Sequence, residues 1–245
     1  MIMLFDVAKR KYIVTGATSG IGEVTARLLR SCGAAVVAVG RQKDKLALLR
    51  EEIACETLAL DIADDGAMAV ALQDVRGIDG LVNCSGISVL ENSLALTSEN
   101  FDRVMQVNAR GTAMMSRHVA ATMIREGRSG SIVNVSSQAA LIALDDHLAY
   151  CASKAAMDAI TRVMCAELGP HGIRVNSVNP TVTLTPMALQ AWADPEKRRR
   201  ILEAIPLRKF AAPEDVAAPI LFLLSDAAAM ISGVSLPIDG GYTSQ

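Results

Sequence analysis

Short apolar runs alternate with longer amphipathic stretches along almost the whole chain. Runs rich in Val, Ile, Leu and Ala predict strands near residues 12–15, 36–39, 57–60, 80–83, 131–135, 174–178 and 234–238. Apolar residues at helical spacing predict helices over 23–30, 43–54, 64–75, 98–127, 149–169 and 213–225, the fourth broken near Gly111. This alternation is typical of α/β proteins, and it predicts a doubly wound parallel sheet of about seven strands with helices on both faces.

The length and composition fit one domain of this kind. The chain has 245 residues and is 51% hydrophobic but only 3% aromatic, which suits a parallel sheet covered on both faces. We therefore expect residues 1–245 to form a single domain. Its least regular stretch is 181–210, which contains three prolines and follows a predicted strand end, where ligands bind in open α/β sheets. We predict a substrate lid there; the alternative is a helical excursion that only packs.

Charge and cysteine usage exclude several classes of protein. The formal net charge is −2, so no general attraction to nucleic acid is expected. No apolar run reaches the ~18 residues needed to cross a bilayer, and no secretory signal is evident at the N-terminus. The five cysteines show neither a CxxC pair nor metal-ligand spacing. We expect reduced cysteines, no metal site, no membrane partner and a cytoplasmic protein.

A glycine-rich turn separates the first predicted strand from the first predicted helix. The segment TGATSGIG, residues 15–22, follows the strand directly. Glycines let the backbone approach a phosphate, and the N-terminus of the next helix offers free N–H groups and a positive dipole end. The spacing is GxxxGxG, which differs from the commoner GxGxxG fingerprint and from nucleoside-triphosphate loops. The turn indicates a dinucleotide site; a plain tight turn is the alternative.

Tyr150 and Lys154 lie four residues apart in the predicted helix 149–169, so both are on one face. A free tyrosine has a pKa near ~10. A neighbouring cation favours the phenolate, so we expect Lys154 to lower the pKa of Tyr150. Such a pair can protonate a carbonyl oxygen or deprotonate an alcohol. By itself, the spacing also fits an amphipathic helix with a surface lysine.

Together these segments resemble the short-chain dehydrogenase/reductase family, over nearly the whole chain. The matching positions are Thr15 to Gly22, Asp61, Asn83 to Gly86, Asn108, Ser137, Tyr150, Lys154 and Asn179-Pro180. The chain is most similar to the branch of L-xylulose (dicarbonyl) reductases and tetrameric carbonyl reductases. The resemblance implies a Rossmann fold and an NAD(P)-dependent oxidoreductase that interconverts a small ketone, such as a ketose or dicarbonyl, and a secondary alcohol.

The resemblance also implies the residues that bind the cofactor. They are Gly16, Ser19, Gly20, Ile21, Gly22, Arg41, Asp61, Ile62, Asn83, Gly86, Tyr150, Lys154, Val182 and Thr185. No acid stands at 39–41, and an arginine there suits the 2′-phosphate of NADP, so NADP(H) is favoured. NAD(H) is the alternative, because relatives often carry a second cation where this chain has Ser19. Asp61 would contact the adenine edge; without the family it would be an ordinary helix N-cap.

The catalytic group implied by the family is Asn108, Ser137, Tyr150 and Lys154. Thirteen residues separate Ser137 from Tyr150, as in the family, whereas Ser136 sits one residue too far. Ser137 would polarise the substrate oxygen, and Lys154 would bind the nicotinamide ribose. Asn108 would kink its helix and hold a water that joins the lysine to solvent. Cys84 replaces an asparagine that normally braces the central sheet, which puts the local hydrogen bonding in doubt.

The substrate residues implied by the branch are Ser137, Gln138, His147, Tyr150 and Trp192. Gln138 and His147 are polar and suit polyol hydroxyls. A rival substrate is a 3-oxoacyl thioester on an acidic carrier protein, for which the basic run 197–200 beside the lid would be the docking patch. We prefer to interpret that run as a solvated helix face. An NAD-dependent polyol dehydrogenase and a cofactor-binding regulator without turnover are also compatible with these residues. The family also implies a homotetramer.

Overall fold

The computed structural model describes residues 5–191 and 194–245. Within them, the strands form one parallel sheet in the order β3-β2-β1-β4-β5-β6-β7. The strands are β1 (Lys11–Thr15), β2 (Ala35–Gly40), β3 (Glu56–Ala59), β4 (Gly80–Asn83), β5 (Gly130–Val135), β6 (Ile173–Pro180) and β7 (Ser235–Ile238). The strand order changes direction between β1 and β4, so the predicted doubly wound sheet is confirmed.

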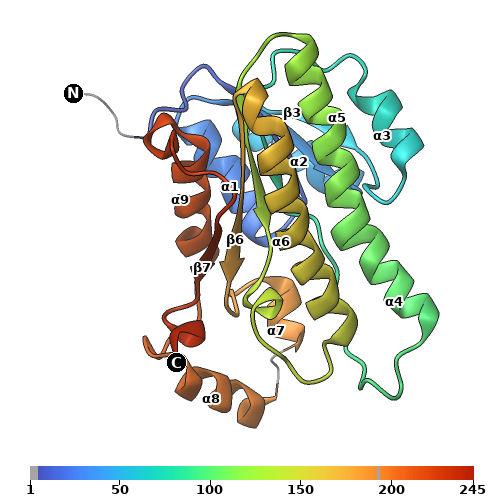
Figure 1. Cartoon of the computed structure of the whole chain (residues 1–245), viewed down its shortest axis with the longest axis vertical. Coiled ribbons are helices and arrows are strands. Elements are labelled where there is room, and N and C mark those ends of the chain that lie inside the picture. The colour runs from blue at the N-terminus through green and yellow to red at the C-terminus, as the bar shows by residue number, and fades with distance from the viewer. Residues whose placement is uncertain (1–4, 192–193) are drawn as a thin grey trace.

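Helices cover both faces of the sheet (Figure 1). They are α1 (Gly20–Ser31), α2 (Lys43–Ile53), α3 (Asp65–Leu72), α4 (Ser98–Met105), α5 (Gly111–Arg125), α6 (Leu148–Leu168), α7 (Pro186–Ala191), α8 (Pro195–Ala204) and α9 (Pro213–Leu224). One apolar layer joins the sheet to α1, α2 and α9. A second layer joins it to α3 and α5, and the C-terminal part of α6 packs against this second layer. Successive strand residues alternate between the layers: Tyr12 and Val14 face the first, and Ile13 faces the second.

The long helical stretch predicted at 98–127 is three segments. A π-helical turn, η1 (Gln106–Arg110), separates α4 from α5 and ends where the break near Gly111 was expected. Asn108 lies in this turn, and π-turns inside helices are frequent at functional sites. The helix predicted over 64–75 ends earlier, at Leu72, and its N-cap is Asp64, whose side chain accepts from Ala67 N at 2.9 Å. The N-cap expected at Asp61 was therefore wrong by three residues.

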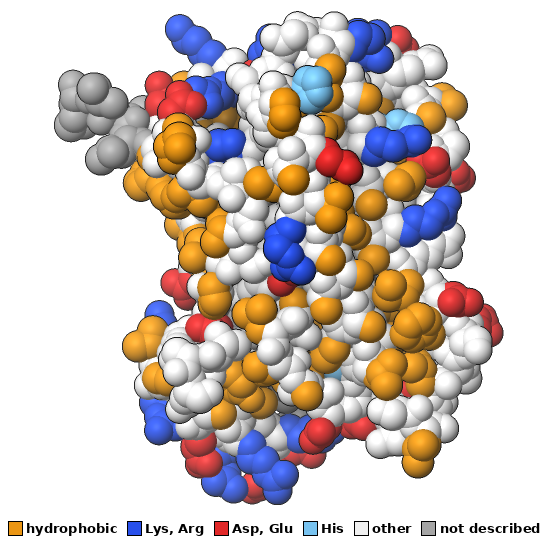
Figure 2. Space-filling view, in the orientation of Figure 1, with side chains coloured by type: hydrophobic (Ala, Val, Ile, Leu, Met, Phe, Trp, Pro, Cys, Tyr) orange, Lys and Arg blue, Asp and Glu red, His pale blue; other side chains and the backbone are white. Residues whose placement is uncertain are grey.

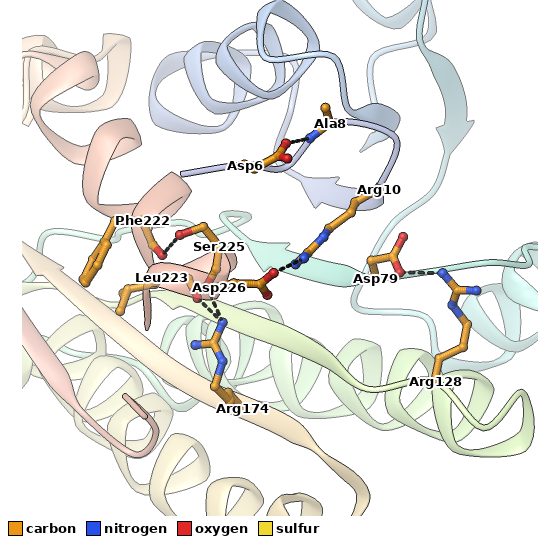
Figure 3. Close-up of polar contacts among 10 residues, drawn as sticks. All are labelled: Asp6, Ala8, Arg10, Asp79, Arg128, Arg174, Phe222, Leu223, Ser225 and Asp226. Carbon is orange, nitrogen blue, oxygen red and sulfur yellow. Dashed lines mark hydrogen bonds and ion pairs between the residues drawn. The ribbon is translucent and has the colours of Figure 1, made fainter. Parts of the chain in front are cut away.

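Ion pairs and arginine–carbonyl hydrogen bonds fasten the amino edge of the sheet (Figure 3). Arg10 pairs with Asp226, and Arg128 pairs with Asp79. Arg174 donates to the carbonyl oxygens of Leu223 at 2.7 Å and of Ser225 at 3.1 Å, which ties β6 to the end of α9. The two hydrogen bonds from Arg174 satisfy carbonyls at the end of α9. They leave the opposite, carboxyl edge as the place where the strand loops are open to a ligand.

The segment 181–210 lies at that carboxyl edge and contains α7 and α8 (Figure 1). Its own small apolar cluster contains Val182, Ile205 and Phe210, which are buried. Pro186 and Pro195 occupy first turns of helices, where a proline costs no hydrogen bond. All five cysteines are free thiols, as expected from their spacing. None of the helices described here has the length and apolarity that crossing a membrane requires.

Candidate active site

A cavity of about 390 Å³ opens at the carboxyl edge of the sheet. Loops that follow β1, β2, β3, β4, β5 and β6 all contribute to its wall, together with α6 and the start of α7. Most of the residues predicted from the sequence line it: Gly16, Ser19, Gly20, Ile21, Arg41, Asp61, Ile62, Gly86, Ser137, Gln138, His147, Tyr150, Lys154, Val182 and Thr185. Residues from six separate loops thus converge on one volume at the position where open α/β sheets bind ligands.

The glycine turn forms a cradle with no space for side chains. Gly16 has φ +68°, and a Cβ there would lie 2.9 Å from the backbone of Cys84. Gly20 has φ +56°, and its Cβ would lie 2.9 Å from Thr185. Gly22 does not line the cavity; its Cβ would lie 2.4 Å from the carbonyl oxygen of Gly16, so it lets α1 pack on the turn. The cradle at the N-terminus of a twelve-residue helix fits the pyrophosphate of a dinucleotide.

Arg41 and Asp61 form the outer end of the cavity. Arg41 follows β2, is 65% exposed and lies 3.8 Å from the carboxylate of Asp61, which is 47% exposed. Asp61 Oδ1 also accepts from Ala63 N at 3.0 Å, which holds the loop in place. A guanidinium at the end of β2 offers the planar set of donors that a phosphate accepts. This end of the cavity therefore suits the adenosine half of a dinucleotide.

The turn after β4 differs from the prediction. Asn83 is buried, and its Nδ2 donates to Ser116 Oγ and to Asn134 Oδ1, both at 2.8 Å. It braces the centre of the sheet and does not line the cavity, so the expected direct contact with a cofactor has no geometric basis. The backbone N–H groups of Cys84 and Ser85 donate to Thr15 Oγ1 at 3.0 and 3.2 Å. The bracing that Cys84 was expected to lose is thus supplied by Asn83 and Thr15.

Tyr150 and Ser137 both line the cavity, and the Ser137 hydroxyl is close enough to the phenol to lower its pKa. Ser137 ends the loop after β5 and caps a short 3₁₀ turn, accepting from Ala139 N at 3.1 Å. Ser136 has a different task, because its hydroxyl donates to the carbonyl oxygen of Lys154 at 3.2 Å. Of the two adjacent serines, only Ser137 presents its hydroxyl to the phenol.

The pKa of Tyr150 is governed by burial more than by the lysine. Burial raises this pKa above the ordinary value, and the hydrogen bond with Ser137 lowers it. Lys154 Nζ lies 5.6 Å from the centre of the Tyr150 ring and donates to Val135 O at 2.8 Å. Burial lowers the pKa of Lys154 to about 8, against the opposing effects of Cys84 and Asp158. The expectation that Lys154 lowers the pKa of Tyr150 is therefore corrected: burial raises this pKa, and the group that lowers it is Ser137.

Asn108 does not line the cavity either; it clamps the loop after β4 from behind. Its Oδ1 accepts from Ile87 N at 2.8 Å, and its Nδ2 donates to Ile87 O at 2.9 Å and to Ser153 Oγ at 3.0 Å. An asparagine that binds both backbone groups of one residue fixes that residue as a neighbouring strand would. The local widening of the helix in η1 places this side chain, and the amide has no free N–H left.

Sequence reasoning missed a buried carboxylate behind the catalytic group. Asp158 lies on α6, one turn beyond Lys154, and is 4% exposed. It accepts from Ser177 Oγ at 3.0 Å and from Asn179 Nδ2 at 2.8 Å. Asn179 Nδ2 also donates to the carbonyl oxygen of Ser137 at 3.0 Å, so the carboxylate holds the serine loop through one amide. The signal in the sequence is an acid four residues after the lysine, on the same helix face.

The structure describes all of the predicted substrate residues except one. Gln138 is buried, lines the cavity and has an amide oxygen without a partner. His147 lines the cavity, its ring 6.0 Å from that of Tyr150, and its Nδ1 contacts Asp145 O at 2.6 Å. Trp192 lies outside the described residues. Val182 and Thr185 line the cavity, with Thr185 beside Gly20 of the glycine turn; their contact with a nicotinamide stays a prediction.

A phenol, a serine hydroxyl and a buried lysine that converge beside a dinucleotide cradle define an oxidoreductase of the carbonyl–alcohol class. The family model described as enoyl-(acyl carrier protein) reductase matches residues 16–243. L-xylulose reductase of Bos taurus is 46% identical over 96% of this chain and 97% of its own. Carbonyl reductase [NADPH] 2 of Sus scrofa is 46% identical over 98% of this chain and 99% of its own. The structure of a short-chain type dehydrogenase/reductase from Mycobacterium marinum superposes with a TM-score of 0.93 at 31% identity, covering 99% of this chain and 98% of that one.

The chain belongs to the short-chain dehydrogenase/reductase family, as its sequence indicated, and is an oxidoreductase that uses a nicotinamide dinucleotide. The resemblance extends from the glycine turn to the C-terminal segment, so no large part of the chain lies outside the match.

Proposed function

We propose that the protein is an NADP-dependent reductase of small hydroxylated ketones, which interconverts a ketose or a dicarbonyl and the corresponding alcohol. The observation that carries this proposal is the convergence of Tyr150, Ser137 and Lys154 with a buried, unpartnered amide oxygen of Gln138 in one cavity. The relatives named L-xylulose reductase and carbonyl reductase [NADPH] support the substrate class and the cofactor.

In the proposed mechanism the protein's residues handle the proton and the developing charge. The glycine turn at Gly16 and Gly20 would hold the dinucleotide, and its nicotinamide would supply or accept the hydride. Tyr150 donates its proton to the substrate oxygen during reduction and takes it back during oxidation. Ser137 donates a hydrogen bond to the same oxygen and stabilises the negative charge that forms there. Lys154, held by Val135 O, supplies positive charge beneath the phenol. Asp158 and Asn179 hold the serine loop, and Asn108 holds the loop opposite.

The decisive experiment is a substrate and cofactor panel. Steady-state rates for L-xylulose, L-sorbose, diacetyl and an acetoacetyl thioester, each with NADPH and with NADH, separate the proposal from its rivals. We expect the highest kcat/KM with a ketose and NADPH. A preference for NADH with a polyol in the oxidative direction would favour the polyol dehydrogenase instead, and a preference for the thioester would favour a fatty-acid type reductase.

Arg41 carries the NADP preference in this proposal. Arg41→Ala is expected to weaken NADPH binding by roughly 10- to 100-fold, because hydrogen bonds to a charged group contribute ~1.5–3 kcal/mol, and to leave NADH binding nearly unchanged. Lys43→Ala is the matched control, since Lys43 is a nearby exposed cation outside the cavity wall. Dissociation constants from nucleotide fluorescence check both. Equal losses for the two nucleotides would contradict a contact with the 2′-phosphate.

The alternative proposal of a thioester on an acidic carrier protein is supported by the basic run of α8 and by the description of the matching family model. Lys and Arg side chains do gather at the lower end of the molecule, but acidic side chains lie among them (Figure 2). Arg199 pairs with Glu196 and with Glu203, and Lys197 lies 3.7 Å from Asp146. A run whose charges are partly neutralised on its own helix is a weaker docking patch for an acidic protein. The ketone substrate is therefore the better-supported proposal.

A homotetramer, a single domain over 1–245, a cytoplasmic location and a lid over 181–210 stay predictions. The cavity wall supports the lid only for the first part of that segment, through Thr181, Val182, Thr183, Thr185, Pro186, Met187 and Ala188. Lys197 on α8 reaches the loop that carries His147, through Asp146, and thus links the second part to the substrate end of the cavity.

A further inference from the structure

Three buried side-chain oxygens without partners line the cavity, and one of them, on Ser88, belongs to no sequence motif. They are Oε1 of Gln138, Oγ of Ser88 and Oγ1 of Thr181. Within the described residues, the other buried polar atoms without partners lie outside the cavity wall. A buried polar group left unpaired costs roughly as much as a lost hydrogen bond, so such groups are rare unless a ligand or water completes them.

The three oxygens come from three neighbouring loops at the carboxyl edge. Ser88 follows β4, Gln138 follows β5 and Thr181 follows β6, and these strands are adjacent in the sheet. Ser137 and Tyr150, the proposed hydrogen-bonding and proton-transferring groups, line the same cavity. The unpaired oxygens therefore lie on the loops that surround the reacting carbonyl.

The backbone of each of these loops is held by hydrogen bonds. Both backbone groups of Ile87, next to Ser88, are bound by Asn108. Thr181 N donates to Ile238 O at 3.0 Å, and Thr181 O accepts from Thr183 Oγ1 at 3.0 Å. Gln138 O accepts from Leu141 N at 2.8 Å. The backbones are thus satisfied while the side chains are not, which is the arrangement of a preorganised ligand site.

We infer that Ser88 and Thr181, together with Gln138, form a polar wall that binds hydroxyl groups flanking the reacting carbonyl, and that they are specificity-determining residues for polyhydroxylated ketones. The inference rests on the proposed function. An amide oxygen needs a donor, and a serine or threonine hydroxyl can donate or accept. A ketose hydroxyl satisfies both kinds of group. Diacetyl has only acceptor oxygens, so it leaves the amide oxygen of Gln138 unpaired, and sites built for hydroxyls reject analogues that lack them.

The test compares Ser88→Ala and Thr181→Val with Thr181→Ser, which keeps the hydroxyl. Each deletion is expected to lower kcat/KM for L-xylulose roughly 5- to 10-fold, as one lost hydrogen bond of ~1 kcal/mol implies, and to leave kcat/KM for diacetyl unchanged. Thr181→Ser should stay within about twofold of the wild type for both carbonyls, because the hydrogen bond is retained. Thr112→Val is the matched control: Thr112 is buried with an unpartnered hydroxyl, but it lies on α5 outside the cavity.

Two further measurements separate the wall from other roles. The melting temperature of Ser88→Ala and Thr181→Val should not fall, because the deleted hydroxyls have no partner in the protein to lose. NADPH affinity, followed by fluorescence, should stay the same. If NADPH affinity falls and kcat/KM falls equally for L-xylulose and diacetyl, the hydroxyls belong to the cofactor site and the inference is overturned. The inference is also overturned if the ratio of kcat/KM for L-xylulose to kcat/KM for diacetyl is the same in the variants as in the wild type.

The inference and the proposed reaction can fail separately. Calorimetric titration of the enzyme–NADP⁺ complex with xylitol measures binding without turnover. If the wild type reduces neither carbonyl but xylitol binding still weakens in Ser88→Ala and Thr181→Val, the reaction is wrong and the polar wall stands. If turnover is normal and xylitol binding is the same in all variants, the reaction stands and the wall is refuted.

Discussion

Tyr150→Phe is expected to lower kcat for ketone reduction by at least ~100-fold, because it removes the phenol that we propose passes a proton to the substrate oxygen. Ser137 remains in this variant and can still polarise the oxygen, so a residual rate is expected. The ring of Phe keeps the contacts with His147 and Lys154, so folding should be intact. NADPH affinity is expected to change little. The loss should therefore appear in kcat, as for a group that acts mainly in the transition state.

Tyr12→Phe is the matched control for this experiment. Tyr12 is buried in β1, near the amino edge of the sheet and away from the cavity. Burial raises the pKa of its phenol to about 12. Its hydroxyl is outside the cavity, so turnover should equal that of the wild type. A Tyr150→Phe variant with wild-type turnover would remove Tyr150 from the mechanism. Wild-type protein that binds NADPH but turns over no carbonyl in the panel would instead favour a regulator.

The sequence predicted the sheet well because a parallel sheet has strict requirements. The inner strands β1, β2, β4, β5 and β6 are buried on both faces, so their sequences are largely continuous apolar runs, and those runs stand out in this chain. Element ends were less accurate for a physical reason. Asp61 and Asp64 both precede the same helix, and only the geometry of the turn shows that Asp64 accepts from the helix while Asp61 faces Arg41.

The candidate site was predictable where a motif fixes it and not where contacts between distant segments do. Spacing along one helix was enough to bring Tyr150 and Lys154 together. In contrast, Asn83 looked like a cofactor ligand because of its position, yet its partners are on α5 and β5, far away in sequence. Ser88 has no motif at all. It becomes visible only as an unpaired oxygen in a folded cavity.

The pKa values of Tyr150 and Lys154 could not be predicted from their spacing in the sequence either. A pair of residues in sequence suggested that a cation would act on a phenol, but the strength of such an effect depends on solvent. Burial of both groups opposes charge on each: it raises the pKa of Tyr150 and lowers that of Lys154. Asp158 opposes the effect on Lys154, and it belongs to a hydrogen-bond network that no spacing rule describes. The lysine is therefore held at a cost to the fold.

Lys154→Met is expected to abolish most activity and yet to stabilise the protein near neutral pH. The pKa of Lys154 is about 8 in the folded protein, against ~10.4 for a lysine in an unfolded chain. Below pH 8 both states carry the proton, and the folded state bears the full cost of a buried charge. Between the two pKa values the unfolded chain binds more protons, so the stability of the wild type rises with pH. Met fills the same volume without charge.

The expected gain in the free energy of unfolding at pH 7 is about 1–3 kcal/mol. The upper value is the free energy that corresponds to the pKa difference between the folded and unfolded states. The lower value allows for the lost hydrogen bond to Val135. Chemical denaturation between pH 6 and 10 should show this gain shrinking as the pH passes through 8 and approaches 10. Lys11→Met is the matched control, because Lys11 is partly exposed and pairs with Glu56 at 2.8 Å, so its removal should give no such gain. A Lys154→Met variant that is less stable than the wild type at pH 7 would show that the buried charge is fully compensated, and that its retention needs no catalytic reason.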